Sequence, residues 1–156
     1  MNYVIDASVF VSAAQASDVH YAESVLLFGR LEKTPNANVF CPTLLLAEYS
    51  ASIVRRTGDA SLAESLVDLL YTLQGLKLEP LTESRARRAA RTAAMHRLRG
   101  ADAVYVALAE ETSATLVTWD IEMIQRGAAV VPLLTPSAWI ETQKPKNDKI
   151  DTEASS

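Results

Sequence analysis

The sequence has a single cysteine, Cys41, among its 156 residues. One thiol excludes an intrachain disulfide and gives a thiolate zinc site nothing to build on. There are only two histidines, His20 and His96, and neither has the i, i+4 partner of a helical zinc site, so both are expected at the surface. The five glycines stand apart from one another, which excludes a glycine-rich phosphate loop.

Long hydrophobic runs are also missing. No apolar stretch approaches the roughly 20 residues that a membrane span needs. The N-terminus does not read as a secretion signal, because Asp6 interrupts its apolar run and no basic segment precedes it. We therefore expect a soluble, cytoplasmic protein without a membrane partner. The hydrophobic content of 49% is enough for one sizeable core, so we expect one domain over residues 1–141 and a polar tail over 142–156.

The formal net charge is −4, which would ordinarily argue against nucleic acid as a partner. The basic residues are unevenly distributed, however. Eight of the fifteen are arginines between positions 55 and 99, namely Arg55, Arg56, Arg85, Arg87, Arg88, Arg91, Arg97 and Arg99. Net charge is therefore a poor guide to the partners of this chain.

Short apolar runs alternate with longer amphipathic stretches, a pattern typical of parallel strands connected by helices. Strands are predicted over 3–5, 39–41, 76–78, 115–118 and 130–133, and helices over 19–31, 43–56, 60–73, 82–99 and 101–111. Asp18 and Thr82 are expected to cap the first and fourth of these helices, and Gly100 to end the fourth. The chain is thus predicted to be an α/β protein with a parallel sheet.

Two acids follow the ends of predicted strands: Asp6 comes directly after the run 3–5, and Asp120 lies two residues beyond the run 115–118. In open parallel sheets ligands bind beyond the carboxyl ends of the strands, so both carboxylates should reach one edge. Two further acids lie among apolar residues, Asp102 at the start of a helix and Glu48 within another. Buried carboxylates need a partner or a metal, and an oxygen-only ligand set suits Mg²⁺ or Mn²⁺.

Each acid also has a purely structural interpretation. Asp6 and Asp120 could simply cap the helices or turns that follow the strands, and Asp102 could be a first-turn acid favoured by the helix dipole. Glu48 could pair with Arg55 or Arg56, although offsets of seven and eight place them two turns away. The four acids together are harder to explain in this way than any one of them.

The arrangement resembles the PIN-domain family, and within it the VapC-type toxin ribonucleases of VapBC toxin–antitoxin pairs. The resemblance spans roughly residues 1–140 and rests on four features: Asp6 with Ser8 two residues on, Glu48 early in a helix, Gly100-Ala101-Asp102-Ala103, and Thr118-Trp119-Asp120. It implies a three-layer α/β/α sandwich around a parallel sheet of about four to five strands. It also implies a magnesium-dependent endoribonuclease, with Mn²⁺ as a possible substitute, that forms a homodimer and binds a cognate antitoxin.

The resemblance assigns roles to individual residues. Asp6, Glu48, Asp102 and Asp120 match the family's acidic, metal-binding catalytic site, and Ser8 matches its small hydroxyl. Glu122 is an expected accessory acid, with a solvated glutamate at a helix start as the alternative. Trp119 departs from the pattern, being bulky where relatives vary. The implied reaction is hydrolysis of an RNA phosphodiester by metal-activated water.

Arg97 and Arg99 directly precede Asp102, and we predict that they contact RNA phosphates. The same arginines could instead pair with acidic residues of an antitoxin.

Leucines at 62, 66, 69, 70 and 73 surround Tyr71 and lie near helical spacing, which favours a stripe that faces the core alone. The alternative is that these side chains exceed what one core can hide and leave a surplus for a dimer or antitoxin contact.

Two other functions remain open. One is a catalytically silent module that holds an arginine of a partner protein in its acidic pocket. The other is a phosphoryl transferase with Asp6 as nucleophile, which is disfavoured because Ser8 stands where such enzymes usually carry a second aspartate.

Overall fold

The computed structural model describes residues 1–144, and this part of the chain contains a five-stranded, fully parallel sheet. The strands are β1 (Asn2–Ile5), β2 (Asn38–Pro42), β3 (Leu76–Glu79), β4 (Thr115–Val117) and β5 (Leu133–Leu134). They lie in the order β3-β2-β1-β4-β5. The chain adds strands on one side of β1 and later on the other, so β1 and β4 flank the topological switch point, where open α/β sheets form their ligand crevice.

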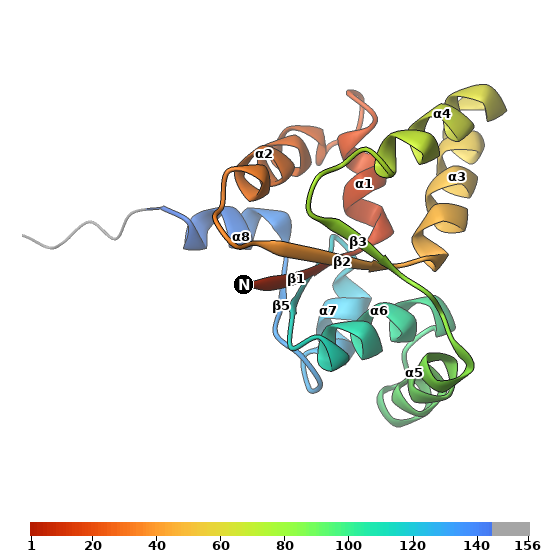
Figure 1. Ribbon diagram of the computed structural model, residues 1–156, viewed down its shortest axis with the longest axis vertical. Coiled ribbons are helices and arrows are strands. Elements are labelled where there is room, and N and C mark those ends of the chain that lie inside the picture. The colour runs from red at the N-terminus through yellow and green to blue at the C-terminus, as the bar shows by residue number, and fades with distance from the viewer. Residues whose placement is uncertain (145–156) are drawn as a thin grey trace, which may run out of the picture.

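Helices cover both faces of this sheet (Figure 1). One face carries α1 (Ala7–Ala13), α2 (Tyr21–Glu32), α3 (Leu44–Thr57) and α4 (Ala60–Leu70), and the other carries α5 (Glu83–His96), α6 (Gly100–Glu111) and α7 (Ile121–Gly127). The last helix, α8 (Pro136–Thr142), packs against α2 and β5. The predicted α/β/α sandwich is confirmed, and so is its parallel sheet of four to five strands.

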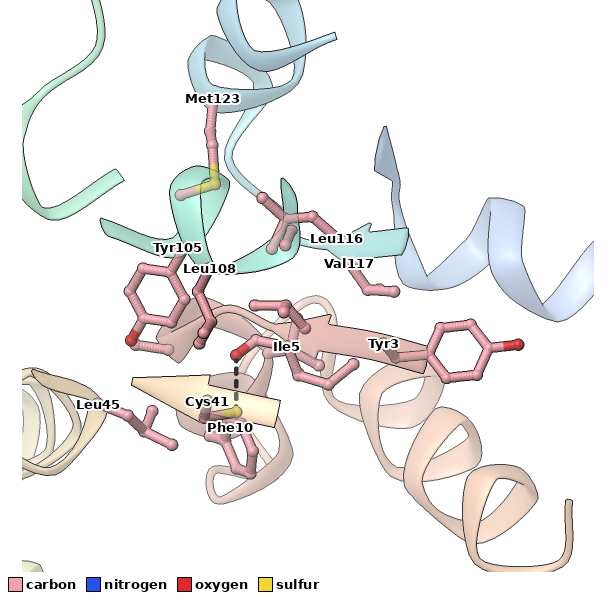
Figure 2. Close-up of a cluster of buried hydrophobic side chains, with 14 of the residues drawn as sticks. Tyr3, Ile5, Phe10, Cys41, Leu45, Tyr105, Leu108, Leu116, Val117 and Met123 are labelled. Carbon is pink, nitrogen blue, oxygen red and sulfur yellow. Dashed lines mark hydrogen bonds between the residues drawn. The ribbon is translucent and has the colours of Figure 1, made fainter. Parts of the chain in front are cut away.

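The central strands are buried from both sides, which explains why they read as continuous apolar runs rather than as alternating ones. Ile5 in β1 is fully buried, with Tyr105 and Leu108 of α6 on one side of the sheet and Phe10 and Leu45 on the other (Figure 2). Full burial of a side chain of this size contributes roughly 1.5–3 kcal/mol. The core therefore fixes the carboxyl end of β1, where the first acid follows.

Most predicted elements exist, with ends shifted by a few residues. The last strand, predicted over 130–133, is confined to Leu133–Leu134. The short helices α1, α7 and α8 were not predicted, because seven residues are too few to display a clear helical period.

Two predicted helix boundaries are wrong. Asp18 does not cap α2: His20 occupies the N-cap position, and the Asp18 carboxylate accepts a hydrogen bond from the backbone N–H of His20 at 2.8 Å. Gly100 does not end α5 but opens α6. Arg97 ends α5 instead, in the left-handed conformation with φ of 55°. Thr82 caps α5 as predicted.

Within residues 1–144, no helix has both the length and the apolar character to cross a membrane. The predicted polar tail begins at residue 142, but α8 extends to Thr142. The remainder of that prediction, over 145–156, lies outside the described residues.

Candidate active site at the carboxyl edge of the sheet

The carboxyl ends of the central strands open into a pocket of about 620 Å³. This volume lies within the range of about 300–1,000 Å³ typical of ligand sites. All four acids singled out in the sequence line it: Asp6 after β1, Glu48 from α3, Asp102 from α6 and Asp120 after β4. Four elements far apart in the sequence thus bring one carboxylate each to the same pocket.

Asp6 is the most deeply buried of these acids, with 6% of its surface exposed. It is the N-cap of α1, and its carboxylate accepts hydrogen bonds from the backbone N–H of Ser8 at 3.2 Å and from the hydroxyl of Thr118 at 3.0 Å. Burial raises the pKa of Asp6, and the hydrogen bonds from Ser8 and Thr118 oppose that rise. The predicted capping role and a place in the pocket therefore coexist in one residue.

Asp120 occupies the equivalent position after β4. It is the N-cap of α7, and its carboxylate accepts a hydrogen bond from the backbone N–H of Met123 at 3.0 Å. Its own N–H donates to the Thr118 hydroxyl at 3.0 Å. Because that hydroxyl also donates to Asp6, Thr118 joins the two acids through one oxygen atom.

Asp102 lies in the first turn of α6, beside Arg99 at the N-cap of that helix. Arg99 Nε donates to Asp102 Oδ2 at 2.8 Å, and the same guanidinium forms a second ion pair with Asp120. Burial raises the pKa of Asp102, Arg99 opposes the rise, and the negative charges of Asp120 and Asp6 add to it. The hydrogen bond to Asp102 is the largest cause that raises the pKa of Arg99. Arg99 is therefore the internal counter-charge of the pocket.

Glu48 accepts a hydrogen bond from the Tyr105 hydroxyl at 2.6 Å. Burial raises the pKa of Glu48, the Tyr105 hydrogen bond opposes the rise, and the charges of Asp6 and Asp102 reinforce it. The alternative ion pairs with the arginines seven and eight positions later are not formed. Arg56 pairs with Asp18 at 2.6 Å, and Arg55 donates to the Ser52 hydroxyl at 3.2 Å.

The donor set has the chemistry of a site for a hard divalent cation, since every acid offers only oxygen. Burial is the main cause that raises the pKa values of Asp6, Glu48 and Asp102, and the charges of neighbouring acids add to the rise for Glu48 and Asp102. A cation bound in the pocket would relieve that repulsion. As they stand, the residues from 1 to 144 include no group of three or more His, Cys, Asp or Glu side chains that could hold a metal ion. The guanidinium of Arg99 pairs with Asp102 and Asp120 and so occupies part of the space in which a metal ion would bind.

Other predicted site residues lie differently. Ser8 lines the pocket, and its hydroxyl accepts a hydrogen bond from the backbone N–H of Trp119 at 3.1 Å. Glu122 is not among the described residues that line the pocket, and its carboxylate pairs with Arg126 at 2.8 Å. Arg97 is exposed at the end of α5, and its contact with RNA stays a prediction.

Some of the clustered arginines lie on α5 and are occupied by intramolecular pairs. Arg85 binds Glu111 and Glu79, each at 2.8 Å, and Arg87 binds Glu83 at 2.9 Å. These arginines are therefore less available to RNA than the sequence suggested.

Several pocket residues were missed in the sequence. His20 and His96 are both half-buried rather than exposed, and the ring of His20 stacks on Trp119 in the pocket wall. Arg55 also lines the pocket, as a cation distinct from the predicted pair at 97 and 99. Only Trp119 carried a signal, as a bulky residue between Thr118 and Asp120. Nothing local marks His20, because its contact is formed by the fold.

Several solved structures share this architecture at low sequence identity. VapBC2 of Rickettsia felis, solved with a DNA fragment from its promoter, has a TM-score of 0.66 and 18% identity over 86% of this chain and 98% of the other. VapC20 of Mycobacterium tuberculosis, described as a toxin that cleaves the sarcin-ricin loop, has a TM-score of 0.69 and 17% identity over 83% and 96%. FitAcB of Neisseria gonorrhoeae has a TM-score of 0.64 and 19% identity over 86% and 98%.

No curated protein matches the chain in sequence. The family comparison does give a match, to the PIN domain, over residues 3–129. That span includes most of β1, the whole of β4 and all four acids of the pocket. On this match, the chain belongs to the PIN domain family.

Proposed function

We propose that the protein is a divalent-metal-dependent endoribonuclease and the toxin of a toxin–antitoxin pair. The observation that carries the proposal is the convergence of Asp6, Glu48, Asp102 and Asp120 in one pocket at the switch point of the sheet. The structural neighbours support it, since one is described as a toxin that cleaves the sarcin-ricin loop and another comes from a VapBC complex. With RNA as its substrate, the proposed site of action is the cytoplasm.

Mg²⁺, or Mn²⁺ in its place, would be held by carboxylates of Asp6, Asp102 and Asp120, with Glu48 completing the acidic set. When bound, such a cation lowers the pKa of water and stabilises the charge on the phosphoryl oxygens, as hydrolysis of a phosphodiester requires. Ser8 and Thr118 orient the Asp6 carboxylate through hydrogen bonds. Tyr105 orients Glu48 in the same way.

The phosphodiester must enter a pocket lined by four acids, which by themselves repel it. Arg99 reduces this repulsion, because its guanidinium lies against both Asp102 and Asp120 and is still 56% exposed. Arg97 would extend the positive charge along the bound RNA, outside the pocket. We therefore assign both arginines to RNA, with Arg99 in the pocket and Arg97 beyond it.

The helix α4 supports the proposal of a protein partner. Some of its apolar side chains, and those that follow it, remain outside the core. Leu69 is 54% exposed and Tyr71 is 65% exposed, whereas Leu70 is buried. The leucine stripe thus has a surplus that could be covered by an antitoxin or by a second copy in a homodimer.

A second candidate function has one observation in its favour. The pocket already accommodates a guanidinium between Asp102 and Asp120, so it could hold an arginine of a partner protein without catalysis. The phosphoryl-transferase alternative has no such support, because Ser8 is engaged with Trp119 and Asp6 is buried.

The two candidates are separated by assaying purified protein on total RNA in EDTA and then with increasing Mg²⁺ or Mn²⁺. Metal-dependent cleavage that disappears in Asp102→Asn supports the nuclease. Asp59→Asn is the matched control, because Asp59 also caps a helix, α4, but is exposed and does not line the pocket. Cleavage that persists in EDTA, or that survives in Asp102→Asn, would overturn the proposal.

A further inference from the structure

Two aromatic rings form part of the wall of the acidic pocket. The imidazole of His20 and the indole of Trp119 stack nearly parallel, with ring centroids 3.8 Å apart and an interplanar angle of 10°. Both side chains line the pocket and are half-buried, so part of the stack remains accessible. The roles proposed above for the acids and for Arg99 leave this pair without a function.

Hydrogen bonds to buried and half-buried serines hold Trp119 in place. Trp119 Nε1 donates to Ser24 Oγ at 2.8 Å, and that fully buried hydroxyl also bonds the hydroxyl of Ser12 at 2.6 Å. The backbone N–H of Trp119 donates to Ser8 Oγ at 3.1 Å. Moving the indole out of the wall would break its hydrogen bond to the buried Ser24 hydroxyl, which is costly. The ring is therefore a rigid surface.

The backbone of His20 is fixed as well. This residue is the N-cap of α2, and its backbone N–H donates to Asp18 Oδ1 at 2.8 Å. Asp18 Oδ2 pairs with Arg56 Nη1 of α3 at 2.6 Å, and both of these residues also line the pocket. The stack is thus organised in advance, which lowers the entropic cost of binding a flat ligand.

A cation lies in the same pocket. Arg55 donates to the Ser52 hydroxyl at 3.2 Å. In the part of the chain that the structure describes, its guanidinium forms no ion pair with a carboxylate, unlike those of Arg56 and Arg99. A rigid aromatic surface, an uncommitted guanidinium and a set of acids thus share one pocket. The aromatic surface suits a nucleobase, the guanidinium suits a phosphate, and the acids suit the site of cleavage.

We propose that the His20–Trp119 stack is a platform for one unstacked nucleobase of a single-stranded RNA, and that Arg55 contacts an adjoining phosphate. The inference rests on the proposed nuclease function and names the feature of the substrate that the site recognises. Bases in loops and single strands are free to stack on aromatic side chains, whereas those of a duplex are not. Because Trp119 directly precedes Asp120, a base on this platform holds its phosphodiester beside the carboxylates.

The test measures binding apart from cleavage. The parent is the Asp6→Asn variant, and the probe is a short fluorescein-labelled single-stranded RNA whose sequence is taken from fragment ends that the wild type produces. In fluorescence anisotropy, His20→Leu should weaken binding by roughly 5- to 150-fold, the fold-change equivalent to about 1–3 kcal/mol of base stacking. His20→Tyr keeps a flat ring and should restore affinity to within about twofold of the parent.

Two controls make the result specific. His96→Leu makes the same substitution at the other histidine, which is half-buried but does not line the pocket, and should leave affinity unchanged. The second control replaces each base of the RNA in turn by an abasic position. At one position, the abasic replacement should lower the RNA affinity of the parent as much as the His20→Leu substitution does. The same replacement should not lower the affinity of His20→Leu further, since both changes remove the same contact.

Tryptophan emission gives an independent readout, because the chain has two tryptophans and the other, Trp139, is only 1% exposed. The RNA should quench emission of the parent but not of Trp119→Phe. Equal affinity of parent and His20→Leu, or a similar loss at every abasic position, would overturn the platform even where the wild type cuts RNA. A wild type that neither cuts RNA nor yields a binding probe would instead overturn the nuclease proposal, and the platform with it.

Discussion

Asp6 and Asp120 occupy equivalent places in neighbouring strand–helix units, yet their surroundings differ. Asp6 directly follows β1 and caps α1, and Asp120 lies three residues beyond the end of β4 and caps α7. Asp6 is buried and held only by uncharged donors, the N–H of Ser8 and the hydroxyl of Thr118. Asp120 is half-buried and paired with Arg99. The same local motif thus leaves the Asp6 carboxylate without a counter-charge, whereas the Asp120 carboxylate has one.

The difference shows which level of structure decides each property. The cap position follows from the local backbone, because a short acidic side chain satisfies the free N–H groups at a helix start. The electrostatic surroundings come from residues remote in sequence, such as Thr118 for Asp6 and Arg99 for Asp120. Removing or exchanging these neighbours should therefore change the chemistry of the site more than the fold.

The largest effect is expected from Asp6→Asn. The amide oxygen can still accept the bonds from Ser8 and Thr118, so the fold should persist, while the charge needed at the site is lost. We expect cleavage of RNA to fall by at least about 1,000-fold, since a metal site contributes several kcal/mol and each 1.36 kcal/mol is tenfold in rate. Initial rates at saturating Mn²⁺ measure this, with Asp59→Asn as control. Activity within tenfold of wild type would contradict it.

Thr118→Val breaks the one side-chain contact that the two acids share. The hydroxyl is fully buried, donates to Asp6 and accepts from the N–H of Asp120. Its loss leaves buried polar groups unpaired, and we expect the free energy of unfolding to fall by about 1–3 kcal/mol. Urea denaturation in EDTA measures the change. Thr118→Ser keeps the hydroxyl and should lose less; equal losses in both variants would mean that the methyl group matters, not the hydrogen bonds.

The positions of both acids could be predicted, because the strands before them are continuous apolar runs and parallel strands share a carboxyl edge. Glu48 and Asp102 could be associated with them only through their apolar surroundings and through resemblance to a family. The partners could not be predicted in the same way. The Arg99–Asp120 pair and the stack of His20 on Trp119 join segments far apart in the chain, and no periodicity marks such contacts.

The helices that carry the two caps show the same limit. Both α1 and α7 have seven residues, too few for an apolar stripe to repeat. The sequence therefore located Asp6 and Asp120 correctly at strand ends but left open whether helices or turns follow them. Tertiary packing, rather than local pattern, determines such short helices.

Arg99→Gln removes the counter-charge that distinguishes Asp120 from Asp6. We expect the variant to bind Mn²⁺ roughly fivefold more tightly, because the guanidinium competes with a cation for Asp102 and Asp120, and an exposed ion pair is worth at most about 1 kcal/mol. Isothermal titration calorimetry measures the affinity. Arg126→Gln is the matched control, since Arg126 pairs with Glu122 outside the pocket. Unchanged or weaker binding in Arg99→Gln would show that Arg99 does not compete with the cation.

The smallest effect concerns pH and the missing counter-charge of Asp6. Burial raises the pKa of this carboxyl in the folded protein above its ordinary value of 3.8. The folded state therefore holds the proton over a range where the unfolded chain has released it. The stability that protonation provides is present below pH 3.8 and is lost as the pH rises through the folded-state pKa.

Asparagine resembles the protonated aspartic acid, so Asp6→Asn should become more stable relative to wild type as the pH rises through this range. Thermal melts in EDTA at constant ionic strength, from pH 4 to pH 7, measure the difference in midpoint. Asp59→Asn provides the baseline for an exposed helix cap. A divalent cation should reduce the gain, because it stabilises the wild-type carboxylate. A difference that shrinks with rising pH would mean that the hydrogen bonds from Ser8 and Thr118 outweigh the burial of Asp6.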